Sequence, residues 1–201
     1  MQTYYEYEWD AFYCYPNSHV LINKLNIMDA EQLQTAEREI TSLRMAQFLS
    51  APPNGPLDYA YLRGIHRMLF SDIYAWAGHP RTVDISKGSM FCHDRYIDEQ
   101  CASLFARLQD EQYLTGIASK KRLIQRLAHY LGELNAIHPF REGNGRTQRL
   151  FIEVLCQRLG YSLRFERITN DEMIRASQFS FQGDEAAMIA VIERALEAYP
   201  R

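Results

Sequence analysis

The longest apolar stripe in the chain lies between Ser119 and Pro139, and it constrains the fold more than any other feature. Its apolar residues recur three or four positions apart, as one face of a helix requires. They are Leu123, Ile124, Leu127, Leu131, Leu134 and Ile137. Serine is a favoured N-cap, and a proline disfavours helical conformation in the residue before it. The pattern therefore predicts a core helix that begins after Ser119 and ends at His138, with other helices packed against it.

Further segments show helical spacing and capping signals, so the chain is expected to be mainly α-helical. Asp29 can cap a helix that ends before the run APPNGP. Thr169 with Glu172 resembles a capping box, and Gly160 stands where a left-handed cap is expected. The expected helices begin near residues 29, 57, 94, 119, 144, 169 and 184, and the last runs through residue 196.

One stretch between the second and third of these helices has a β pattern instead. Residues 76–92 contain Gly and Pro, then the β-favouring Thr-Val-Asp-Ile, then a Lys-Gly-Ser turn signal, which together predict a short hairpin. Residues 161–168 are expected to be extended. No repeat or linker interrupts the chain. We therefore expect one all-α domain over residues 29–201 with one small β-hairpin, and residues 1–28 as a segment that packs on this core or leads into it.

Composition and charge exclude several classes of function. The formal net charge is −3 and the pI is near 6.1, so the chain as a whole does not attract nucleic acid or an anionic membrane. No apolar run approaches the roughly 18 residues that span a bilayer, and the N-terminus lacks the pattern of a secretion signal. The cysteines form no C-x-x-C pair, which favours a reducing cytosol, and Cys92 beside His93 lacks the second ligand pair of a structural zinc site. They are Cys14, Cys92, Cys101 and Cys156. We expect a cytoplasmic protein without direct nucleic-acid or membrane binding.

The sequence HPFREGNGRTQR, residues 138–149, breaks the helical pattern with a proline, two glycines and three arginines. A new helix is expected near Asn144 or Gly145, and its first N–H groups lack internal partners and carry the positive end of the helix dipole. Arg146 and Arg149 lie on the same side of its first turn. Cations are unfavourable at that end unless an anion lies between them. The stretch therefore predicts a polyphosphate site.

Glu142 and His138 add chemistry to this site. Mg²⁺ is commonly held by one or two carboxylates plus substrate phosphates, so Glu142 is a candidate metal ligand. His138, expected to present its imidazole at the C-terminal edge of the preceding helix, suits a general base. Taken singly, each feature has an ordinary explanation as a capping histidine, a glycine loop or a solvated basic face. The combination indicates an ATP–Mg²⁺ site with a basic imidazole, without saying which phosphorus is attacked.

The combined pattern resembles the signature H-x-F-x-[D/E]-G-N-G-R-x-x-R of Fic-domain proteins of the Fido superfamily. The matching positions are His138, Phe140, Glu142, Gly143, Asn144, Gly145, Arg146 and Arg149. The stretch WAGHPRTVDISKG, residues 76–88, is similar to the hairpin flap of bacterial Fic proteins. The resemblance covers about residues 30–200. It implies the all-α Fic core, with a flap at about 76–92 and an active-site loop at 138–149.

The resemblance also implies the reaction: AMP passes from ATP to a Tyr, Ser or Thr hydroxyl of a target protein, and pyrophosphate leaves. His138 would deprotonate the hydroxyl, Phe140 would pack into the core and fix the loop, and Glu142 would hold Mg²⁺ against the α- and β-phosphates. The other motif residues would bind phosphates: Gly143, Asn144 and Gly145 at the α- and β-phosphates, Arg146 at the β-phosphate and Arg149 at the γ-phosphate. Such roles suit phosphorus chemistry, which depends on positioning and charge stabilisation.

The flap is expected to dock the target, because strand addition uses main-chain hydrogen bonds and tolerates many sequences. The candidate docking residues are Val83, Asp84, Ile85, Ser86, Lys87 and Gly88. Among them, Ile85 is a candidate apolar clamp. A purely structural hairpin is the alternative. Residues 175–178 are a candidate wall for the adenine base, although a place in a core helix explains them equally simply.

Regulation is implied by the resemblance as well. Fic proteins are typically silenced by a helix carrying [S/T]-x-x-x-E-[G/N], whose Glu pairs with the last motif arginine. Partial matches end at Glu39 and Glu166, but neither is followed by Gly or Asn. The resemblance therefore implies a small bacterial toxin inhibited in trans by a small antitoxin. The expected targets of that class are the ATPase subunits of DNA gyrase and topoisomerase IV.

Two other functions stay open. The first is a related phosphotransferase that binds the nucleotide reversed and transfers the γ-phosphate. That relative lacks the second glycine and the Gly-Arg pairing, which this chain retains as Gly145 and Arg146. The second is a nucleotide-binding interaction module without turnover, against which the presence of both His138 and Glu142 argues.

Overall fold

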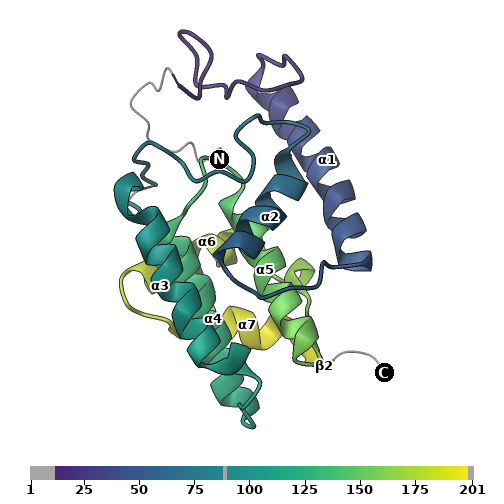
Figure 1. Cartoon of the computed structure of the whole chain (residues 1–201), viewed down its shortest axis with the longest axis vertical. Coiled ribbons are helices and arrows are strands. Elements are labelled where there is room, and N and C mark those ends of the chain that lie inside the picture. The colour runs from purple at the N-terminus through teal and green to yellow at the C-terminus, as the bar shows by residue number, and fades with distance from the viewer. Residues whose placement is uncertain (1–11, 88–89, 199–201) are drawn as a thin grey trace.

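The computed structural model describes residues 12–87 and 90–198, and within them the architecture is helical (Figure 1). The α-helices are α1 (Ala30–Ser50), α2 (Tyr59–Phe70), α3 (Ile97–Asp110), α4 (Lys120–Ile137), α5 (Asn144–Arg158), α6 (Asn170–Phe181) and α7 (Ala186–Ala195). Short 3-10 helices are η1 (Asp94–Tyr96), η2 (Gln112–Leu114) and η3 (Phe165–Arg167), and the strands are β1 (Tyr161–Leu163) and β2 (Leu196–Ala198). The expected all-α class is confirmed.

The predicted helix starts follow from local capping chemistry. The Asp29 carboxylate accepts a hydrogen bond from the N–H three residues on (2.9 Å), and the Ser119 hydroxyl does the same at the start of α4 (3.4 Å). Thr169 and Glu172 form the complete capping box at α6. Gly160 follows α5 with a φ of 80°, which is the left-handed conformation that glycine adopts without steric cost. These starts and this stop are confirmed.

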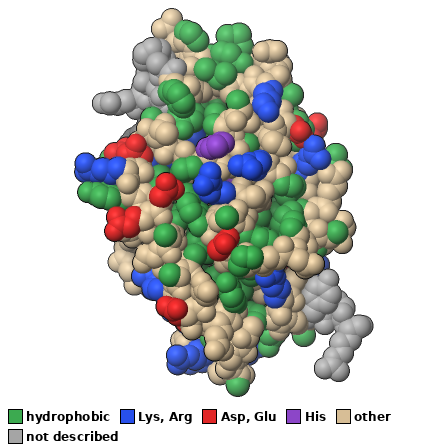
Figure 2. Space-filling model, in the orientation of Figure 1, with side chains coloured by type: hydrophobic (Ala, Val, Ile, Leu, Met, Phe, Trp, Pro, Cys, Tyr) green, Lys and Arg blue, Asp and Glu red, His purple; other side chains and the backbone are tan. Residues whose placement is uncertain are grey.

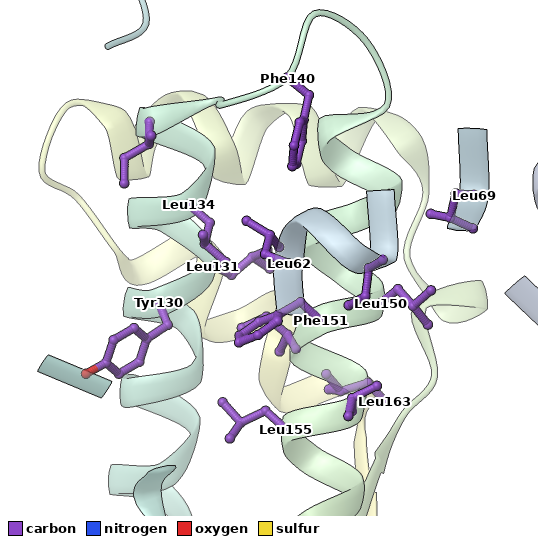
Figure 3. Packing of buried hydrophobic residues seen from close by; sticks show 14 of the residues in the cluster. Leu62, Leu69, Tyr130, Leu131, Leu134, Phe140, Leu150, Phe151, Leu155 and Leu163 are labelled. Atoms are coloured by element: carbon purple, nitrogen blue, oxygen red, sulfur yellow. The ribbon is translucent and has the colours of Figure 1, made fainter. Parts of the chain in front are cut away.

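Helices α4 and α5 form the centre of the core, with α2 packed against α5 and α7 against α4. Figure 3 shows Leu62 of α2, Leu131 and Leu134 of α4 and Phe151 of α5 meeting between these helices. All four side chains are almost completely buried. Burial of apolar area on this scale is the main favourable term in folding. The core therefore holds the C-terminal end of α4 and the N-terminal end of α5 in a fixed relation, and the loop 138–143 joins them.

The β structure differs from the prediction in its place. In the described part of the flap, pairing is limited to an isolated bridge between Ser86 and Met90 and a hydrogen bond from Phe91 N–H to the Ile85 carbonyl (3.2 Å). The regular two-stranded sheet is antiparallel and pairs β1 with β2, with Ser162 opposite Glu197. Only the first part of the expected extended stretch 161–168 is a strand, because η3 follows it.

Residues 12–28 pack on the helical core. Tyr13 and Cys14 are buried, and Lys24 N–H donates to the Ile73 carbonyl after α2 (2.7 Å). The Asn23 side chain fixes the turn, since its amide nitrogen donates to the carbonyls of Leu21 (2.9 Å) and Ile27 (2.7 Å). This segment is therefore joined to the core by specific contacts.

The surface carries no large area of one charge on the face shown in Figure 2, where acidic and basic side chains are interspersed. A mixed surface gives no long-range attraction for a polyanion. In the part of the chain that the structure describes, no helix combines the length and the apolar character needed to cross a membrane. The positive charge of the 138–149 motif is thus local, and Arg146 and Arg149 lie in the first turns of α5.

Candidate active site

The loop between α4 and α5 contains two left-handed residues that set its shape. His138 caps α4 with φ 50° and ψ 61°, and its N–H donates to the Leu134 carbonyl (3.0 Å). Gly143 caps α5 with φ 80°, and a Cβ there would lie 2.2 Å from the Phe70 ring. Glycine is therefore required at 143 by both conformation and space. His138 thus lies outside the right-handed helical region, as predicted for a residue before proline, but it is left-handed rather than in the extended conformation that a following proline favours.

His138 lies at the C-terminal edge of α4, as expected, and its imidazole is buried there. The residue is 6% exposed, and its ring stacks on the Phe91 ring at 3.9 Å between centroids and 16° between planes. Burial lowers the pKa of His138 to about 3, although Nδ1 lies 3.2 Å from the Asn135 carbonyl. A carbonyl can only accept, so this contact places the hydrogen on Nδ1. The neutral ring then has Nε2 as its basic nitrogen.

A cavity of about 490 Å³ opens beside His138. Its walls come from the end of α4, the first two turns of α5, α6 and the flap. Gly145, Gln148 and Arg149 line it from α5, and Ser177 and Gln178 of α6 form part of the opposite side. Part of the segment 175–178 thus lies at the cavity as well as on a helix. A cavity of this size suits a small-molecule ligand.

Phe140 and Asn144 hold the loop together. Phe140 is fully buried. The Asn144 side chain accepts a hydrogen bond from Phe140 N–H (2.8 Å) and donates one to the Phe140 carbonyl (2.6 Å). Both hydrogen bonds join the Asn144 side chain to the backbone of one residue, so the expected phosphate-hole role of Asn144 stays a prediction that concerns its backbone N–H. Its side chain is engaged in the loop, and only its backbone N–H remains at the helix start.

His66 of α2 is part of the site and was missed from the sequence. It is fully buried, and its ring stacks on Phe140 at 3.9 Å and 13°. Gly78 N–H donates to Nδ1 (2.7 Å), so Nε2 carries the hydrogen and donates to the Glu142 carbonyl (3.0 Å). Burial lowers the pKa of His66 to about 3. The neutral ring thus links the base of the flap to the backbone of Glu142.

Glu142 and Arg146 form a network with a second residue that the sequence did not suggest, Glu37 of α1. Arg146 Nη2 is 2.6 Å from Glu37 Oε2 and 3.3 Å from Glu142 Oε1, and Nη1 is 3.3 Å from the Thr41 hydroxyl. The Tyr74 hydroxyl also donates to Glu37. Burial, and then the charge of Glu142, raise the pKa of Glu37. In this arrangement the Arg146 guanidinium joins two carboxylates.

Arg149 is the contrasting cation. Within the described part of the chain its guanidinium has no ion-pair partner, and it lines the cavity beside His138 as well as a second cavity of about 500 Å³ beside α1. Burial and the neighbouring Arg146 lower the pKa of Arg149. A Cβ at Gly145 would lie 3.1 Å from Arg149 Nη1, so glycine makes room for this guanidinium. A half-buried cation without an anion is unfavourable, and a bound phosphate would relieve it.

The flap residues differ in how exposed they are. Ile85 is 2% exposed, so its side chain is covered by the chain itself, and its expected role as an apolar clamp for a target stays a prediction. Asp84 is engaged internally, since its carboxylate contacts His93 Nδ1 (2.7 Å) and accepts a hydrogen bond from Asp94 N–H (2.8 Å). Val83, Ser86 and Lys87 are partly exposed, and Gly88 lies outside the described residues.

The fold and the loop define a helical protein in which the start of α5 lies beside a buried histidine, and comparison with known proteins gives the family. The Fic/DOC family model matches residues 56–156. The probable protein adenylyltransferase y4lH of Sinorhizobium fredii is 40% identical over 90% of this chain and 93% of its own length. The probable protein adenylyltransferase Fic of Escherichia coli is 39% identical over 90% of each chain.

A solved structure supports the same assignment. The BepC protein of Bartonella tribocorum, crystallised with bound AMPPNP, superposes with a TM-score of 0.89 at 28% identity, covering 94% of this chain and 98% of that one. The chain belongs to the Fic/DOC family.

Proposed function

We propose that this protein is a protein adenylyltransferase, which transfers AMP from ATP to a Tyr, Ser or Thr hydroxyl of a target protein. The observation that carries the proposal is the shared cavity: the neutral His138 ring, the N-terminus of α5 and the Arg149 cation all border it. A base and an anion site within one cavity are what attack on a phosphorus atom requires. Curated relatives that cover nearly the whole chain are named for this activity.

His138 acts as the general base in this proposal. Its Nδ1 hydrogen points to the Asn135 carbonyl, which leaves Nε2 to take the proton of the target hydroxyl. The oxygen then attacks the α-phosphorus of ATP, and the bond from that phosphorus to the bridging oxygen breaks as pyrophosphate leaves. Because burial keeps the ring neutral, His138 needs no deprotonation before it reacts. Its basicity rises once a phosphate replaces the apolar surroundings with negative charge.

The start of α5 and Arg149 hold the phosphates. The first helical hydrogen bond of α5 is donated by Thr147 N–H to the Gly143 carbonyl (3.1 Å), so the preceding N–H groups of residues 144–146 are at the helix terminus. Gly145 lets the phosphates approach this backbone. Arg149 supplies a full positive charge for the γ-phosphate. For Arg146 to reach the β-phosphate, its guanidinium must leave Glu37, so its contribution in the resting state is to orient Glu142.

Glu142 fits a magnesium ion held mainly by substrate phosphates. In the described chain no group of three or more His, Cys, Asp and Glu side chains could form a metal cage. Glu142 Oε1 is engaged by Gly143 N–H (2.8 Å) and Arg146 (3.3 Å), and the residue lines the second cavity, beside α1, which it shares with Arg149. One carboxylate with phosphate and water ligands is the usual Mg²⁺ arrangement. When bound, the ion neutralises charge on the leaving pyrophosphate.

Nucleotide and target occupy opposite parts of the cavity in this proposal. Ser177 and Gln178 of α6 lie on the wall that an adenine base would contact. The target would run along the partly exposed flap residues Val83, Ser86 and Lys87, with Gly88 as a further candidate. Its hydroxyl would approach His138 past the Phe91 ring. Since Phe91 covers the imidazole, target binding must displace or slide along that ring.

The test uses ATP labelled on either the α- or the γ-phosphorus, incubated with the protein and a bacterial lysate. The proposal predicts that label enters protein from the α-position only and that His138→Ala abolishes it. His129→Ala is the matched control, because His129 lies on the same helix but pairs with Glu185 at the molecular surface (2.9 Å). Label from the γ-position would establish a phosphotransferase instead, and nucleotide binding without any label would establish a binding module.

We also propose that a separate small antitoxin inhibits this protein, which would then act as a cytoplasmic bacterial toxin. The second cavity, beside α1, ends at Arg149 and is bordered by Arg38, Thr41 and Asn170, and a helix carrying a glutamate could pair there with Arg149. Glu39 and Glu166, the carboxylates of the partial sequence matches, are exposed. Neither is therefore proposed as the inhibitory glutamate that pairs with Arg149. Glu37 does face the motif, but it pairs with Arg146.

The expected targets, the ATPase subunits of DNA gyrase and topoisomerase IV, are proposed on the family resemblance. The test is to label these purified subunits with α-labelled ATP in the presence and absence of the small protein encoded beside this chain. Labelling that the neighbour suppresses supports both proposals. Full activity and growth arrest that no neighbouring small protein changes would contradict inhibition in trans.

A further inference from the structure

Arg81 lies at the base of the flap, and its side chain is completely buried. Figure 1 shows this segment as the blue-to-teal chain between α2 and α3. A buried guanidinium is costly unless its donors are satisfied. Here the donors point to backbone carbonyls, and the nearest carboxylate, that of the partly exposed Asp84, is 3.8 Å away. The arginine therefore has a role other than a close ion pair.

One set of contacts joins Arg81 to the end of α4. Its Nε donates to the His138 carbonyl (2.9 Å), and Nη2 lies 3.3 Å from the Ile137 carbonyl. Its backbone N–H donates to the Pro139 carbonyl (2.8 Å). The last carbonyls of a helix have no internal partners and carry the negative end of the dipole. Arg81 thus caps α4 at the residue that supplies the base.

A second set of contacts joins the same guanidinium to both arms of the flap. Nη1 donates to the Val83 carbonyl on the first arm (2.7 Å), and Nη2 donates to the Cys92 carbonyl on the second arm. Cys92 N–H in turn donates to the Ala136 carbonyl near the end of α4 (3.1 Å). The neighbour of Cys92 is Phe91, whose ring stacks on His138. One side chain therefore fixes the flap arms, the Phe91 position and the His138 backbone together.

We propose that Arg81 is a positioning residue that couples the flap to His138, so that a target held on the flap meets the imidazole at a fixed place. The coupling rests on the proposed docking role of the flap. The planar fork of arginine can serve carbonyls on three sides at once, which the single ammonium of lysine cannot do. Arg81→Lys keeps the charge but should release one or both flap arms.

The direct test is residue-resolved amide hydrogen exchange in wild type and Arg81→Lys. The coupling predicts that exchange rises at least tenfold for the amides of residue 81, Phe91 and Cys92 together, while the interior of α5 is unchanged. Arg63→Lys is the matched control, because Arg63 donates from Nε to one carbonyl, that of Gly78 (2.9 Å). In Arg63→Lys, the rise in amide exchange should be confined to the turn at Gly78. Unchanged flap amides in Arg81→Lys, or a uniform rise over the whole fold, would overturn the proposal.

Exchange in the wild type under mild denaturant gives the same answer if the variant does not fold. The coupling predicts that the amides of Arg81, Phe91 and Cys92 open with one shared free energy, as a cooperative unit does. Three unrelated opening free energies would overturn it.

Activity separates this proposal from the adenylyltransferase assignment. In Arg81→Lys the transfer of α-label to lysate proteins should fall at least tenfold, whereas the dissociation constant of a non-hydrolysable ATP analogue should stay within twofold. A purely structural arginine would weaken nucleotide binding and thermal stability together. Absence of transfer in the wild type would contradict the proposed function, and the exchange results would still decide the coupling.

Discussion

Replacement of His66 by Phe tests whether the buried imidazole holds the flap base and Glu142 in place. Phenylalanine preserves the stacking on Phe140 but removes both hydrogen bonds of the ring, those with Gly78 N–H and the Glu142 carbonyl. Each buried backbone group left without a partner costs about 1–3 kcal/mol. Part of this cost is offset, because the variant no longer buries a polar ring. We expect a loss of about 2–4 kcal/mol in the free energy of unfolding.

Chemical denaturation monitored by circular dichroism measures this loss. For a chain of this length, 1 kcal/mol shifts Tm by about 2–4 °C, so Tm should fall by about 4–16 °C. Magnesium-dependent ATP binding should weaken as well, because the Glu142 backbone loses its donor. His129→Phe is the control, since that side chain is 27% exposed in a surface pair with Glu185 and should cost about 0–1 kcal/mol. Wild-type stability and nucleotide affinity in His66→Phe would refute the reasoning.

Three further predictions concern the loop and pH. Asn144→Ala, which removes both bonds to the Phe140 backbone, should lower the free energy of unfolding by about 2–4 kcal/mol and weaken ATP binding, as calorimetry can measure. The folded-state pKa of His138 is about 3, below the unfolded value of about 6.5. The contribution of the neutral, buried ring to the free energy of unfolding is therefore fully present above pH 6.5 and is lost as pH falls. Wild type should therefore lose about 2 kcal/mol more than His138→Ala between pH 7.5 and 5 in urea titrations. Hydrogen bonds from Arg194 and Thr169 lower the pKa of Glu172 to about 2, so its contribution is present above about pH 4.5 and is lost as pH falls toward 2. Glu172→Gln should remove this loss of stability from the acid unfolding of the protein. Acid titrations that are identical for wild type and Glu172→Gln would contradict the prediction.

Much of the helical fold could be predicted because its signals are local. The caps at Asp29, Ser119 and Thr169 lie within three residues of their partners, and the apolar spacing of α4 is visible in the sequence itself. The pairing of β1 with β2 could not be predicted, because it joins residue 161 to residue 198 across η3, α6 and α7.

The candidate site was predictable where one motif carries it and not where distant residues complete it. His66, Arg81 and Glu37 act on the loop from other elements, and single titratable residues in amphipathic helices or turns carry no distinctive spacing. For His66, the one available signal is its place on the apolar face of α2 beside Ile65 and Leu69. The burial of Ile85 could not be predicted from the sequence either, because only tertiary packing decides which side of an irregular loop is covered.

AMP transfer with His138 as the base is the step on which the proposed function depends most directly. The decisive measurement is tandem mass spectrometry of target peptides after incubation with ATP and Mg²⁺, for wild type and for His138→Ala. We expect an AMP group on a Tyr, Ser or Thr hydroxyl in the wild-type reaction and no modification with the variant. A phosphate alone on the acceptor, or AMP at the same level with His138→Ala, would contradict the account.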